Sequence, residues 1–422
     1  MPEPSQGPAA LSESDPADSA YSWTRLAIAV LIASIGNVGM WSVVVVLPAI
    51  EQDFQLTRAA AALPYMLMTI GFGLGGIVMG RLADRHGVTV PLAIGAVAIG
   101  AGYVLSGISQ NVWQFALAHG VLIGLFGSSA AFGPLIADIS LWFRRHRGIA
   151  VAICASGNYL AGTIWPPILQ QFVTTAGWRA THIGVGLFCL LTMLPLAALL
   201  RRRPPRPVTA LHGSAPWTSD RAAGLSPGVL QALLILAGIA CCVAMSMPQV
   251  HIVALCADRG FGVARGAEML SLMLGFGIIS RLLSGALSDR IGGLATLMIG
   301  SILQSIALIL YLRADGLTSL YVVSALFGLF QGGLVPSYAI IVRENYPPEE
   351  AATRVGLVLM ATLGGMALGG WLSGAIYDLT GSYAYAFLNG IAWNLVNILI
   401  VAWLLFRATS NRRRRQIATA PA

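Results

Sequence analysis

Lysine is absent from the 422-residue sequence, so all 25 basic residues are arginine. Charged residues of both signs amount to only 10%, whereas a water-soluble domain carries about 25%. This scarcity of charge excludes an ordinary soluble enzyme. A disordered or fibrous chain is excluded as well, because the apolar residues form long blocks and not a low-complexity repeat.

Several motifs of enzymes and metal proteins are also missing. The five cysteines, of which Cys241 and Cys242 are adjacent, have neither the spacing of a disulfide framework nor that of a metal site. No Walker sequence, zinc-ligand set or nucleophile elbow occurs. We therefore predict that the protein is not an enzyme and needs no cofactor or metal. The arginine runs 201–203 and 412–415 border apolar blocks, which favours contact with anionic lipid over nucleic acid.

Hydrophobic residues make up 56% of the chain, and the mean hydropathy is +0.76. The apolar blocks are about 20 residues long, which at about 1.5 Å per residue matches a hydrocarbon core of about 30 Å. The sequence therefore predicts an all-α integral membrane protein with twelve transmembrane helices in two six-helix halves. The predicted spans are residues 24–50, 60–82, 88–108, 112–138, 148–173, 180–200, 228–256, 267–288, 293–312, 317–342, 354–378 and 383–406.

The boundaries of these blocks divide the chain into five parts. They are a polar N-terminal tail (1–23), an N-terminal six-helix bundle (24–200), a linker (201–227), a C-terminal six-helix bundle (228–406) and a basic tail (407–422). Segments on the side of the tails and the linker contain nineteen arginines, and the loops on the other side contain five. Because arginine is retained on the cytoplasmic side, we expect both termini in the cytoplasm and a location in the plasma (inner) membrane.

One loop motif occurs once in each half. The second and eighth spans both end in the pattern G-x-L-x-D-R-x-G, at positions 80–87 and 285–292. This repeat predicts two pseudo-symmetric halves with a substrate site between them near the middle of the membrane. The glycines permit close helix packing, and the aspartates can lie near a positive helix N-terminus, so we predict a gating role for the motif. The predicted gating residues are Gly80, Asp84, Arg85, Gly285, Asp289 and Arg290.

Arg281 is a charged residue inside a predicted span, seven residues before its end. A guanidinium at this depth costs about 2.5–3.5 kcal/mol to insert, so it must face a polar cavity or a partner. Gly277, Ser284 and Ser288 share its helix face and form a small, polar stripe. A planar fork of donors complements a carboxylate, so we predict that Arg281 binds the substrate. The alternative is that Arg281 has a structural role and pairs with Asp289 or with backbone carbonyls.

The loop motif resembles the signature loop of the major facilitator superfamily, and the resemblance extends over residues 24–406. It implies a secondary transporter that alternates between inward-open and outward-open states. The stretch 280–290 is also similar to the eighth helix of monocarboxylate transporters and the related oxalate/formate antiporters, which implies that Arg281 contacts a substrate carboxylate. Oxalate-type members hold a second carboxylate with a lysine in helix eleven. This chain has no lysine, and that departure favours a monoanion.

His119 lies well inside the fourth predicted span. Its imidazole, with an unperturbed pKa of about 6.5, predicts proton coupling and contact with the substrate. A histidine that joins helices by hydrogen bonds is the alternative. Other polar and aromatic residues on candidate pore faces complete the predicted substrate site: Asn37, Trp41, Tyr65, Asn158, Tyr159, Gln331 and Tyr338.

Together these residues predict transport of a small organic monocarboxylate by alternating access, through proton symport or anion exchange. The expected partners are the carboxylate, protons and membrane lipid, and no nucleic acid. Two alternatives remain open from the sequence. One is a multidrug or acidic-metabolite exporter of the same superfamily, and the other is an anion sensor that uses the same scaffold without transport.

Overall fold

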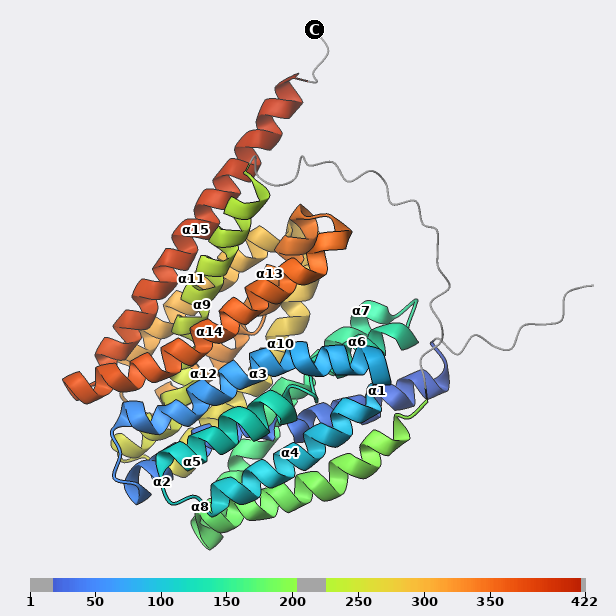
Figure 1. Ribbon diagram of the computed structural model, residues 1–422. Coiled ribbons are helices and arrows are strands. Elements are labelled where there is room, and N and C mark those ends of the chain that lie inside the picture. The colour runs from blue at the N-terminus through green and yellow to red at the C-terminus, as the bar shows by residue number, and fades with distance from the viewer. Residues whose placement is uncertain (1–17, 203–224, 419–422) are drawn as a thin grey trace, which may run out of the picture.

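The computed structural model describes residues 18–202 and 225–418, and all regular structure in these two ranges is helical (Figure 1). The helices before the gap are α1 (Ala20–Gly36), α2 (Val38–Asp53), α3 (Arg58–His86), α4 (Thr89–Gly107), α5 (Val112–Leu117), the π-helix η1 (Ala118–Ser128), α6 (Gly133–Trp142), α7 (Arg147–Ala155) and α8 (Gly157–Leu199). Those after it are α9 (Pro227–Asp258), α10 (Val263–Ile291), α11 (Gly293–Arg313), α12 (Leu317–Gln331), α13 (Leu334–Asn345), α14 (Pro348–Thr380) and α15 (Tyr383–Ala418).

A break in the longest helical segment, at one glycine, determines the number of membrane crossings. Eleven helical segments of the two described ranges are long and apolar enough to cross a membrane, and the longest, Arg147–Leu199, has 53 residues. A continuous helix of that length would measure about 80 Å, far more than a hydrocarbon core of about 30 Å. The segment bends at Gly177, whose φ of 80° is not helical. It therefore crosses twice, and the predicted all-α fold with twelve transmembrane helices is confirmed.

The crossings form two bundles that contact each other through a few helices. In Figure 1 the helices α1–α8 lie in one bundle and α9–α15 in the other. The bundles pack mainly through α3 against α14 and α8 against α10, with a smaller contact between α2 and α9. We call the end where α8 ends and α9 begins the linker end, and the opposite end, where α2 joins α3, the loop end. The bundles fan apart toward the linker end (Figure 1).

The helix boundaries differ in places from the predicted parts. Helix α1 begins at Ala20, and α15 continues as far as Ala418, beyond the predicted end of the last span at 406. A helix that leaves the membrane keeps its backbone hydrogen bonds, so its length can exceed the apolar block. Most of the predicted N-terminal tail and linker, namely 1–17 and 203–224, lies outside the described residues, as do 419–422.

A buried ion pair fixes the first helix at the linker end. The Nε and Nη2 atoms of Arg25 donate to the carboxylate of Asp138 at 2.8 and 2.9 Å, and Nη2 also donates to the Leu200 carbonyl at 3.1 Å. The guanidinium lies 4.6 Å from the centre of the Trp142 ring. The sequence alone does not reveal this pair. The structure shows that it joins α1, α6 and the end of α8 within the first bundle.

Candidate functional site

Arg281 reaches from the second bundle to the first. Its guanidinium lies 3.8 Å from the centre of the Tyr159 ring, and Nη1 donates to the Ala155 carbonyl at 3.3 Å. Gly277 lies one turn earlier on α10, and a Cβ atom there would be 2.4 Å from the Tyr159 ring. The glycine is therefore required for the close approach of α10 to α8 that brings the arginine to this interface.

Other predicted site residues surround this pair. The Tyr159 hydroxyl donates to Oε1 of Gln331 at 3.5 Å, and the indole Nε1 of Trp41 donates to the backbone carbonyl of Asn158 at 3.1 Å. Tyr65 is buried in the same hydrophobic cluster as Trp41 and Tyr159. Six of the nine predicted substrate-site residues are thus brought together where the two bundles meet. These six, which we call the central cluster, are Trp41, Tyr65, Asn158, Tyr159, Arg281 and Gln331.

Three hydrogen-bond donors of this cluster have no acceptor among the residues that the structure describes. They are Nε of Arg281, Nε2 of Gln331 and the Tyr65 hydroxyl, and all three atoms are buried. Among the described residues, no carboxylate forms an ion pair with Arg281. A buried donor without a partner costs about 1–3 kcal/mol, and more when it is charged. An anion with oxygen acceptors would satisfy such a set of donors, whereas a cation would not.

Two predicted site residues lie away from this cluster. The Tyr338 hydroxyl donates to Oδ1 of Asn397 at 2.8 Å, inside the second bundle. Asn37 caps α1 inside the first bundle, and its Nδ2 donates to the Ala33 carbonyl at 2.7 Å. Their helical positions in the sequence suggested a pore face, but both side chains are fully buried within their own bundles. The structure therefore does not bring them to Arg281.

His119 is also inside the first bundle, next to a second histidine that sequence analysis did not select. The ring centres of His119 and His182 are 5.5 Å apart, and the Phe115 ring stacks on both. Every hydrogen bond and ring contact of His119 among the described residues comes from the first bundle. The structure thus does not place His119 beside Arg281.

The hydrogen bonds of this histidine pair assign both tautomers. Nδ1 of His119 lies 3.0 Å from the Phe115 carbonyl, which can only accept, so Nδ1 carries the proton. Nδ1 of His182 lies 2.8 Å from the Ser106 hydroxyl, which itself donates to the Tyr103 carbonyl, so this Nδ1 also donates. Both Nε2 atoms are therefore proton acceptors, and both are buried without a partner in the described part of the chain.

The loop end is closed by an ion cluster that the sequence did not reveal. Arg58 at the start of α3 is 7% exposed, and it pairs with Glu51 at 2.8 Å and with Asp258 of the other bundle at 3.0 Å. It also donates to the Tyr383 hydroxyl. The carboxylate of Asp378 accepts from the first two backbone N–H groups of α3, each at 2.8 Å. We call these five residues the loop-end ion cluster.

The two loop motifs, for which a gating role is predicted, lie at the other end of the molecule. Asp84 and Asp289 are exposed, and within the described part of the chain neither carboxylate forms a hydrogen bond or ion pair. Nothing lies within 4 Å of a Cβ built at Gly80 or Gly285, so these glycines make no close helix contact in this state. The bundles are therefore joined at the loop end and separated at the linker end.

Asparagine at Asp84 or Asp289 is expected to slow transport and to favour this linker-open state. Neither carboxylate has a partner within residues 18–202 and 225–418 in this state, so any latch that they form exists only when the linker end is closed. Spin-label distances between α7 and α13, measured with turnover in proteoliposomes, test the expectation. Unchanged distances and turnover in both variants would show that the motifs do not act as gates.

Comparison with known proteins agrees with this architecture. The sequence model of one protein family, the Major Facilitator Superfamily, matches residues 26–314 and 234–420 of this chain. The MFS-type transporter pynF of Aspergillus niger is 27% identical over 322 residues, which cover 75% of this chain and 72% of that protein. Monocarboxylate transporter 13 of Rattus norvegicus is 26% identical over 341 residues, covering 80% and 77%. The agnestins efflux protein AgnL12 of Paecilomyces divaricatus is 22% identical over 325 residues, covering 77% and 73%.

A solved structure has the same arrangement of helices. It is a bacterial homolog of the human lysosomal transporter Spinster in an inward-facing and unoccupied conformation, with a TM-score of 0.70. The two sequences are 16% identical, and the match covers 94% of this chain and 98% of that one. At this identity the likeness establishes the fold and not the substrate.

Proposed function

Because the chain belongs to the major facilitator superfamily, we propose that this membrane transporter carries a small organic monocarboxylate, either with a proton or in exchange for another anion. The observation that supports the proposal most directly is the interface around Arg281. Among the described residues, the Arg281 guanidinium has no carboxylate partner, and two further buried donors of the central cluster have no acceptor. The Tyr159 and Trp41 rings provide flat apolar surfaces for the body of the substrate.

The names of the relatives point to two kinds of transport. The likeness to monocarboxylate transporter 13 favours a monocarboxylate as the substrate, and the likeness to an efflux protein favours export. Arg281 is compatible with both, since each cargo has an anionic group. Export of an acidic metabolite is therefore the second candidate function.

We propose that the linker end faces the cytoplasm and that the membrane is the plasma (inner) membrane. The excess of arginine in the segments of that end supports this orientation. With this orientation, the loop-end ion cluster closes the outer side, and Arg281 is approached from the inside. The state described here is then inward-facing.

Monoanions are expected to bind at least tenfold more tightly than oxalate or succinate. Arg281 is the one cation of the central cluster, so a second carboxylate would be desolvated without a partner. Titration calorimetry with lactate, pyruvate and benzoate against their dicarboxylate counterparts measures the preference. Tighter binding of a dicarboxylate would contradict it.

We propose that the coupled proton binds to the His119–His182 pair. Each of the two Nε2 atoms is an acceptor without a donor among the described residues, so either can bind an added proton, and Tyr103 is the nearest other titratable ring. His119→Gln is then expected to keep ligand binding and counterflow exchange, and to lose accumulation driven by a pH gradient. Undiminished proton-driven accumulation would reduce both histidines to packing residues.

Transport itself is tested with purified protein in proteoliposomes. Uptake of radiolabelled lactate, pyruvate and benzoate into vesicles preloaded with the same acid measures exchange, and an imposed pH gradient measures coupling. Exchange that depends on Arg281 supports the proposed function. Binding of these acids without any counterflow would instead identify an anion sensor.

A further inference from the structure

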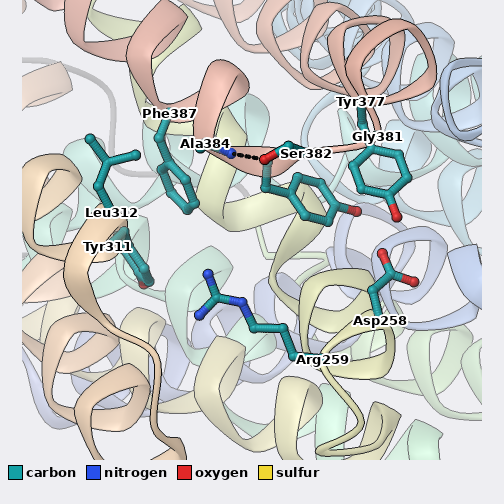
Figure 2. A pocket seen from close by; sticks show the side chains of 10 residues that line it. Asp258, Arg259, Tyr311, Leu312, Tyr377, Gly381, Ser382, Ala384 and Phe387 are labelled. Carbon is teal, nitrogen blue, oxygen red and sulfur yellow. Dashed lines mark hydrogen bonds between the residues drawn. The ribbon is translucent and has the colours of Figure 1, made fainter.

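A pocket at the loop end belongs to the second bundle alone (Figure 2). It has a volume of about 270 Å³ and is lined by the ends of α9, α11 and α14 and by the start of α15. It opens beside the exposed turn at Gly381. None of the six residues of the central cluster lines it, so it is a separate site.

Arg259 is the one cation among the ten residues that line this loop-end pocket. Figure 2 shows its guanidinium extending into the pocket. Nη1 donates to the carbonyl of Ala314, and no other hydrogen bond of this side chain occurs within the described ranges. The guanidinium is therefore held in place while its remaining N–H groups can receive a ligand.

Two pairs of aromatic rings form the walls of the pocket. The Tyr311 and Phe387 rings are stacked at 5.0 Å with an interplanar angle of 13°, and the centres of Tyr377 and Tyr383 are 4.4 Å apart. Flat apolar groups stack favourably on such surfaces. A cation between aromatic walls suits a small anion that has a flat apolar body.

The one anion that lines the pocket is engaged elsewhere in this state. Asp258 directly precedes Arg259, but its carboxylate pairs with Arg58 of the first bundle at 3.0 and 3.2 Å. The charge of Asp258 is thus balanced by a residue outside the pocket. Arg259 is left as the group that determines which charge the pocket attracts.

We propose that the loop-end pocket is a second binding site, which takes a small aromatic carboxylate and favours the closed loop end. When the bundles separate at this end, Asp258 loses Arg58 and becomes free to pair with its neighbour Arg259, where it competes with the ligand. The ligand therefore binds more tightly while the loop-end ion cluster is intact. By linkage, a bound ligand stabilises the closed loop end and slows the transport cycle from that side.

Benzoate is the probe, with benzamide as its neutral control, and the full chain is studied in lipid nanodiscs. The Arg281→Gln variant removes the central anchor, and we expect one benzoate site to remain. Adding Arg259→Gln is expected to weaken that remaining binding at least tenfold. Adding Arg265→Gln, which removes an exposed arginine paired with Glu268 at the same end, is expected to leave it unchanged.

Spin-label distances test whether the bound ligand favours the closed loop end. In the Arg281→Gln variant, benzoate is expected to narrow the distance distribution between spin labels at Gln52 and Asp315 toward the closed loop end, and Arg259→Gln is expected to remove this effect. Thermal unfolding checks that each variant is folded, and Arg259→Lys, which keeps the charge, is expected to retain part of the affinity.

Two results would overturn the second site. One is the absence of benzoate binding to Arg281→Gln, and the other is residual binding that Arg259→Gln does not weaken. Both differ from a failure of the proposed function, which would appear as unimpaired carboxylate transport by Arg281→Gln itself.

Discussion

Replacing Arg281 by glutamine is expected to abolish carboxylate binding at the central cluster, and with it transport, while the protein stays folded. The guanidinium touches the Tyr159 ring and the Ala155 carbonyl, but no described carboxylate pairs with it, so its charge is available to a ligand. Truncating one partner of a buried charge pair costs about 3 kcal/mol or more, which is about a hundredfold in Kd. Titration calorimetry and counterflow uptake measure the loss.

Lysine at position 281 should recover little of this affinity. An ammonium is a point charge and cannot reproduce the two parallel donors of a guanidinium, nor its stacking on the Tyr159 ring. Arg313→Gln, an exposed arginine at the end of α11, is the matched control for the loss of one positive charge. Wild-type affinity in Arg281→Gln would show that the residue is structural, as the alternative interpretation of the sequence holds.

Replacing Arg58 by glutamine is expected to open the loop end. One guanidinium faces Glu51 and Asp258, with the Asp378 carboxylate bound at the adjacent start of α3. Without the cation, three carboxylates from both bundles remain close together, and like charges repel. Because the ion pairs are partly exposed, we expect the closed loop end to lose about 1.4 kcal/mol of stability. This loss shifts the ratio of closed to open loop ends about tenfold.

Spin labels at Gln52 and Asp315, which lie on different bundles, report this opening as a longer distance. Asp258→Asn should have a smaller effect, since Arg58 then keeps Glu51, while Arg265→Gln at the same end should have none. An unchanged distance distribution in folded Arg58→Gln would mean that helix packing, such as Gly374 against Arg58 and Ala59, closes this end without the ions.

The twelve crossings could be predicted because they depend on local features of the chain. Each apolar block is long enough to span a hydrocarbon core, and its ends are marked by charge or by turn residues. The break between the fifth and sixth spans, placed between 173 and 180, lies at Gly177 in the structure. Family membership could also be predicted, because the repeated motif is a local pattern. It ends at Gly87 and Gly292, whose φ values of 83° and 85° terminate α3 and α10.

The candidate site could be predicted only in part. Arg281 was selected because burying a charge is costly wherever the helix points, and that argument needs no partner. Asn37 and Tyr338 were selected from their positions on helix faces, and His119 from its depth inside a span and its imidazole. A residue's position along its helix does not determine which neighbouring helix its side chain contacts. The structure places each of these three side chains within a single bundle.

Only the tertiary structure decided which distant residues meet. Arg58 and Asp258 are 200 positions apart, and Arg25 and Asp138 are 113 apart, so neither pair has a local signature. The sequence determined the membrane class, the helix count and the one deep cation, because these follow from transfer free energies of single segments. The closed loop end, the histidine pair and the pocket around Arg259 follow from helix packing, whose energy depends on contacts between residues far apart in the chain.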